Sequence, residues 1–118
     1  MDFVNHLFGG SSDQENQYNE FNSTPKHSAD MSHELLAGAA SFAAAKAYAD
    51  HCKKNGKPTS HAEAKELLAG FAGAFLTHEA ETRGRDAIDA HKQKVAQEKA
   101  EKQLEETFVE EKFETYNP

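Results

Sequence analysis

The sequence predicts an all-α protein built on an antiparallel αα-hairpin with a long charged second helix. Two segments, residues 33–42 (HELLAGAASF) and 65–75 (KELLAGFAGAF), share the sequence Glu-Leu-Leu-Ala-Gly and continue with small residues. In both, apolar residues recur at three- and four-residue steps, which is the spacing of one face of an α-helix. The connection between them, NGKPT, is short, and short connections make neighbouring helices antiparallel.

The N-terminal part of the chain, residues 1–30, is predicted to be a flexible polar arm. It is rich in Gly, Ser, Asn, Asp and Gln, and such a composition buries too little apolar surface to offset the loss of chain entropy. The C-terminal tail, residues 109–118, is expected to fray. The aromatic residues of the arm are interpreted as intermittent cover for the helices: Phe3, Phe8, Tyr18 and Phe21.

The first helix is expected over about 32–55. Ser32 and Asp30 are both suitable N-caps, because their side-chain oxygens accept hydrogen bonds from free backbone amides. Gly56 and then Pro58 supply the stop.

The second helix is expected over about 61–107. It starts with a capping box, SHAE at residues 60–63, in which the serine and glutamate side chains satisfy free backbone amides. Gly84 costs ~1 kcal/mol inside a helix, so the alternative is a break there and a third helix that folds back. One helix of roughly 70 Å is favoured, because residues 86–107 contain only three large apolar anchors, Ile88, Val95 and Leu104.

The repeated motif predicts a close crossing of the two helices. Glycine and alanine between the large apolar residues let helix axes approach toward the lower end of the roughly 8–10 Å range. The residues expected at this crossing are Leu36, Gly38, Ala39, Phe42, Leu68, Gly70, Phe71, Gly73 and Phe75.

A two-helix hairpin rarely supplies adequate stability alone, and association is the expected remedy. We expect a homo-oligomer, either a four-helix bundle made by two hairpins or a coiled-coil pairing along the second helix. Opposite charges four residues apart on that helix, such as Glu79 and Arg83, are expected to stabilise it at its solvated face.

Composition and charge exclude several classes of protein. The chain has 118 residues with a formal net charge of −7, so binding to nucleic acid or to an anionic membrane, which needs clustered cations, is disfavoured. The sequence contains no apolar run of the roughly 18 residues needed to span a bilayer, and its N-terminus does not resemble a secretory signal. The single Cys52 cannot form an intramolecular disulfide. A cytoplasmic protein is therefore expected.

Four of the seven histidines are predicted to pair across the hairpin. The register of the apolar stripes places His33 opposite His78, and His51 opposite His61. With Glu34 beside the first pair, imidazole and carboxylate groups suit zinc, copper or nickel, and an open coordination position would support hydrolysis.

The competing interpretation of these histidines is structural. The sequence has no ligand pair at i, i+4 such as HExxH, and His33 and His61 lie at helix starts, where half-exposed polar residues are common. A pH-responsive packing role is a third interpretation. No catalytic motif is found, since LLAGFAGAF lacks the lysine and the preceding strand of a phosphate-binding loop.

The segment MSHELLAGAASFAAAKAYADHCKKNGKPTSHAEAKELLAGFAGAFLTHEAETRG, residues 31–84, resembles the small fungal CipC-like proteins. The preceding SSDQENQY is similar to the polar N-terminal stretch of that family. The resemblance therefore covers nearly the whole chain up to about residue 105. It implies an association with antibiotic and stress responses. It carries over no catalytic residue, because the family has no established catalytic mechanism.

The sequence therefore favours a non-enzymatic, cytoplasmic stress- or antibiotic-response protein without a cofactor. Such a protein would act through helix-mediated self-association or by binding a protein partner. The alternative is a small metal- or cofactor-binding protein that uses the histidine pairs to hold zinc or another transition metal and has hydrolytic activity.

Overall fold

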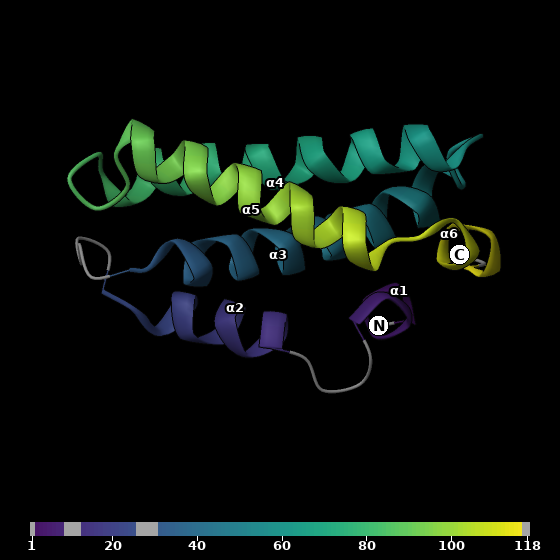
Figure 1. Ribbon diagram of the computed structural model, residues 1–118, viewed down its shortest axis with the longest axis horizontal. Helices are drawn as coiled ribbons and strands as arrows, with labels where there is room; N and C mark the ends of the chain where they lie inside the picture. Colours follow the sequence, from purple (N-terminus) through teal and green to yellow (C-terminus); the bar gives the residue numbers. More distant parts are fainter. Residues whose placement is uncertain (1, 9–12, 26–30, 117–118) are drawn as a thin grey trace.

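Six helices and no strand make up the part of the chain that the computed structural model describes, residues 2–8, 13–25 and 31–116 (Figure 1). The predicted all-α class is confirmed. None of these helices combines the length and the apolar character needed to cross a membrane. In chain order they are α1 (Asp2–Phe8), α2 (Asp13–Ser23), α3 (His33–Asn55), α4 (His61–Arg83), α5 (Ala90–Thr107) and α6 (Glu110–Thr115).

Helix α3 lies in the middle of the molecule. In Figure 1 it runs between α4 and α5 on one side and α1 and α2 on the other, and it contacts all four. A helix that is covered on several sides must bury side chains around most of its circumference, and small side chains let the neighbouring helices come close. This explains the alanine-rich sequence of α3, in which Ala37, Ala39, Ala40, Ala44 and Ala45 are fully buried.

The two central helices begin and end with recognisable caps. Ser32 and Ser60 accept hydrogen bonds from the amides of Leu35 and Glu63, at 3.0 and 3.1 Å. The serine half of the predicted capping box is therefore present at Ser60. The Glu63 carboxylate accepts from the Thr59 hydroxyl at 2.8 Å instead of from the Ser60 amide, so it stabilises the turn before α4. Gly56 ends α3 with φ of 83°, a backbone conformation that favours glycine.

The expected single helix over 61–107 is divided into α4 and α5. Gly84 has φ of 96° and ends α4, and the Asp89 side chain caps the start of α5 by accepting from the Lys92 amide at 2.7 Å. Between them, Ile88 is fully buried and fixes the turn against the core. The longest dimension of the fold is 40 Å, well short of one continuous helix. The sequence interpretation counted large apolar anchors alone, whereas α5 buries Ala96, Ala100 and Leu104.

Within the described residues, both end segments contain helices that the sequence did not predict. Residues 1, 9–12 and 26–30 of the predicted arm, with the alternative N-cap Asp30, and residues 117–118 of the tail lie outside the described part of the chain. The proposed flexible arm contains α1 and α2, which pack against α3 and bury Phe3 and Phe21 completely. The tail expected to fray contains α6 and buries Phe113 and Tyr116. Isolated aromatic residues are enough to hold these terminal helices against the core, because each aromatic side chain inserts between central helices that are already packed together.

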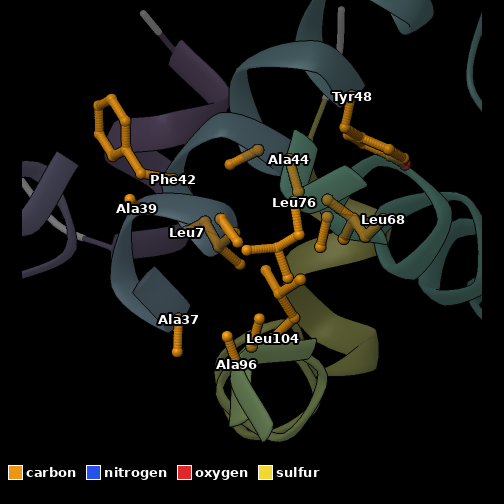
Figure 2. Packing of buried hydrophobic residues seen from close by; sticks show 14 of the residues in the cluster. Leu7, Ala37, Ala39, Phe42, Ala44, Tyr48, Leu68, Leu76, Ala96 and Leu104 are labelled. Atoms are coloured by element: carbon orange, nitrogen blue, oxygen red, sulfur yellow. The ribbon is translucent and has the colours of Figure 1, made fainter. Parts of the chain in front are cut away.

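The residues expected at the α3–α4 crossing are distributed over several interfaces. Leu36, Ala39 and Leu68 are buried as predicted, and Figure 2 shows side chains from α3, α4 and α5 directed into this common interior. In contrast, Gly38 lies against Gln17 of α2, Gly73 lies against Gln97 of α5, and Gly70 is exposed. The prediction of a close α3–α4 crossing lined by these glycines is therefore wrong. It considered only two helices, and so it assigned every small residue to the single interface between them.

The aromatic residues from the same list follow this pattern. Phe42 and Phe75 pack against Tyr18 of α2, with ring centroids 5.0 and 6.4 Å apart, and Phe71 lies beside His51. Helices from the same chain thus cover the hairpin, and Val109 is the one large apolar side chain that is exposed within the described residues. The argument that a bare hairpin needs a second copy for stability no longer applies.

Candidate functional site

The first predicted histidine pair has other neighbours in the structure. The ring of His33 makes an edge contact with His91 of α5, with centroids 6.1 Å apart, whereas His78 is exposed on α4. The Glu34 carboxylate lies 3.4 Å from the Lys99 ammonium. A backbone hydrogen bond and this ammonium both lower the pKa of Glu34. The partners from α5 were missed because the sequence interpretation continued α4 past Gly84.

The second predicted pair, His51 and His61, contributes to packing instead. His51 lies against Phe71, with ring centroids 6.0 Å apart. Nε2 of His61 donates to the Phe108 carbonyl oxygen at 2.6 Å, and its ring packs against Phe108 and Phe113. Over residues 2–8, 13–25 and 31–116, no group of three or more His, Cys, Asp or Glu side chains is placed to hold a metal ion. The metal-site hypothesis therefore gains no geometric support there.

Cys52 is buried one helical turn from Tyr48. The Tyr48 ring packs against the rings of Phe3, Phe108 and Tyr116. Burial raises the pKa of the Cys52 thiol and, more strongly, that of the Tyr48 hydroxyl. Interaction with the neighbouring thiol raises the tyrosine pKa further. A thiol that stays protonated and covered is a weak nucleophile, so Cys52 serves packing.

A surface groove follows the seam between α4 and α5, on the side turned away from α3; we call it the α4–α5 groove. It consists of two successive hollows of about 210 and 430 Å³. The smaller has an apolar floor of Leu68, Ala69 and Leu104 under a charged rim. The larger is floored by small residues, Gly70, Gly73 and Ala74.

Side chains of α5 reach across this groove and fix the register of the two helices. Nε2 of Gln97 donates to the Ala69 carbonyl oxygen at 3.3 Å, and Nε2 of Gln93 donates to the Thr77 hydroxyl at 3.0 Å. A β-carbon at Gly73 would lie 3.1 Å from Oε1 of Gln97, so glycine makes room for that bridge. These two hydrogen bonds connect the helices in one register along the groove.

The two ends of the α4–α5 groove carry opposite charge. At one end, three exposed carboxylates lie beside a single ammonium: Glu66, Glu101 and Glu105 with Lys65. At the other end lie two exposed cations, Arg85 and Lys94. Arg85 donates to Gln93 at 2.6 Å, whereas Glu66, Glu105 and Lys94 form no hydrogen bond or ion pair with the described part of the chain.

This groove was not predicted from the sequence, although two local signals were available. Gly84 favours a break in the helix, which was the alternative to one long helix, and Asp89 has the side chain of a helix N-cap. Together they predict the chain reversal that brings α5 beside α4. Without that reversal, the residues of the groove are distributed along one extended helix.

The sequence was also compared with known proteins. A family profile described as virulence factor CipC-like matches residues 16–109, a segment that contains α3, α4, α5 and the whole α4–α5 groove. No curated protein and no solved structure shows a significant match.

Proposed function

Because the chain belongs to the virulence factor CipC-like family, we propose that it is a non-enzymatic stress- or antibiotic-response protein of the cytoplasm. In this proposal it acts through helix-mediated association, and the α4–α5 groove is the surface that associates. The observation that carries the proposal is the groove itself, whose small-residue floor and exposed rim charges suit contact with another helix.

The shape of the groove supports this assignment. A seam between two antiparallel helices accepts the ridge of a third helix, and small residues on its floor allow a close approach. Leu68 and Leu104 give the smaller hollow an apolar base, and burial of such surface contributes roughly 25 cal/mol per Å² to binding.

The chemistry of the lining residues supports association in the same way. The exposed carboxylates lie at one end of the groove and the cations at the other. Each group can therefore contact charges of the opposite sign on another surface. Such rim charges set orientation and partner choice, and the apolar and small-residue floor supplies most of the contact.

The test is complementation under antibiotic stress in a strain of the source organism that lacks this gene. We expect the wild-type chain to restore growth and Gly70→Leu, which fills the groove, to fail at equal protein level. Ala62→Leu is the matched control, because Ala62 is an exposed α4 residue outside the lining of both hollows. Full restoration by Gly70→Leu would exclude the groove from the function.

A further inference from the structure

We propose that the α4–α5 groove is occupied by helix α4 of a second copy of this chain, related by a two-fold axis that passes near Gly70. This inference rests on the proposed function and specifies its partner. In such a dimer the two α4 helices cross at Gly70, the glycine of α4 that faces open space.

Gly70 is the first observation that points to a close partner. It lies in the interior of α4, where glycine costs ~1 kcal/mol relative to alanine. A β-carbon built at this position has no heavy atom within 4 Å, so packing within the chain does not require glycine there. Its φ is not positive either. The conformation and the internal contacts of Gly70 therefore leave its occurrence unexplained.

The other described glycines do have explanations within the chain. Gly56 and Gly84 have positive φ, and Gly38 and Gly73 make room for the side chains of Gln17 and Gln97. Gly70 differs from all four, because neither a positive φ nor a neighbouring side chain requires glycine there. The close approach of a backbone from another molecule accounts for a glycine at such a position.

The charges along the groove then select the partner. The carboxylate end, with Glu66, Glu101 and Glu105, and the cationic end, with Arg85 and Lys94, lie on opposite sides of the small-residue floor. A two-fold axis through the floor would place each carboxylate end over the cationic end of the other copy. The surface is therefore complementary to itself, which is the requirement for an isologous dimer.

The test is sedimentation equilibrium of the purified full chain from micromolar to millimolar concentration. We expect a monomer–dimer equilibrium for the wild type and for Ala62→Leu. Gly70→Leu should raise the dissociation constant by about a hundredfold, because two leucines would clash at the axis. Its thermal unfolding temperature should be equal to or higher than that of the wild type, since leucine is the better helix former and has open space.

Two results would overturn this inference: a monomeric wild type at every concentration, or a Gly70→Leu variant that dimerises as strongly as the wild type. The complementation test separates these failures from failure of the proposed function. A monomeric wild type together with a Gly70→Leu variant that cannot restore growth would indicate a foreign partner in the groove. A Gly70→Leu variant that restores growth would reject the groove as the functional surface, whatever the oligomeric state.

Discussion

Two glycines of similar sequence context have opposite environments in this fold. Gly38 and Gly70 each follow the sequence Leu-Leu-Ala inside a helix. A β-carbon at Gly38 would overlap Oε1 of Gln17 and lie 2.9 Å from the β-carbon of that residue, whereas one at Gly70 would meet nothing within 4 Å. The repeat in the sequence therefore does not mean a repeat in packing.

This difference predicts opposite effects of the same substitution. Gly70→Ala should raise the free energy of unfolding by about 1 kcal/mol, the difference in helix propensity. Gly38→Ala should lower it by about 1 kcal/mol, because displacing α2 costs more than the propensity gain. Urea unfolding followed by far-ultraviolet circular dichroism, at a concentration low enough to exclude dimers, measures both. Equal stabilisation by the two variants would show that Gln17 does not press on Gly38.

Apart from its interaction with the neighbouring Cys52 thiol, the buried Tyr48 hydroxyl has no hydrogen-bond partner among the described residues. Burial raises its pKa well above the usual value near 10. The folded state therefore disfavours the phenolate that the unfolded chain forms. The tyrosine contribution to stability is fully present below about pH 10 and is lost as the pH rises toward the folded pKa.

Tyr48→Phe should remove this pH dependence. At neutral pH we expect unchanged stability or a gain of up to about 1 kcal/mol, because a poorly satisfied buried hydroxyl is deleted. Above about pH 10 the wild type should lose stability more steeply than the variant, by at most about 1.4 kcal/mol per pH unit. Urea unfolding in a pH series tests this, with Tyr18→Phe as the control at a half-buried tyrosine. Parallel curves for wild type and Tyr48→Phe would contradict the assignment.

At the scale of the elements, Arg83 attaches α2 to the end of α4. It is 6% exposed, and its guanidinium donates to the carbonyl oxygens of Phe21, Thr24 and Pro25 at 2.9, 3.1 and 3.3 Å. It also pairs with Glu79 at 3.0 Å. The fork of donors satisfies carbonyls at and beyond the C-terminus of α2, where a cation is also favoured by the helix dipole.

Arg83→Met should therefore destabilise the fold by about 2–4 kcal/mol. The substitution keeps the aliphatic part of the side chain but leaves those carbonyl oxygens without a hydrogen-bond donor. Amide exchange in α2 should accelerate more than exchange in α5. Arg85→Met, at an exposed position two residues later, is the matched control and should cost under about 0.5 kcal/mol. Similar losses in both variants would contradict the anchoring role.

The same pair of residues shows what the sequence could and could not predict. The spacing of Glu79 and Arg83 predicted an ion pair, and the structure contains it. The sequence interpretation placed the pair on a solvated face, since a residue pattern does not reveal that α2 folds over the end of α4. Similarly, Ser32 and Ser60 predicted helix caps from local chemistry, whereas the histidine pairing depended on long-range register and gained no support.

At the scale of the whole molecule, the fold class followed from periodicity, but the arrangement of the helices did not. Chain reversal at Gly84 depends on burial of Ala96, Ala100 and Leu104 against α3 and α4, a set too poor in large residues to predict from its own sequence. The helices so assembled cover the core of one chain. Association is therefore an expectation about function and is no longer required for folding.

A charge-exchange experiment tests whether two copies meet through the α4–α5 groove in antiparallel orientation. One variant combines Glu101→Lys with Glu105→Lys, and a second combines Arg85→Glu with Lys94→Glu. In the proposed dimer, two copies of either variant would place like charges together at both contacts, whereas a mixed pair would restore opposite charges at both.

Native mass spectrometry of the two folded variants, alone and mixed, distinguishes the species by mass. We expect each variant alone to be monomeric and the mixture to form a heterodimer that dissociates at high salt. Homodimers of either variant as abundant as those of the wild type, or a mixture that remains monomeric, would contradict this arrangement.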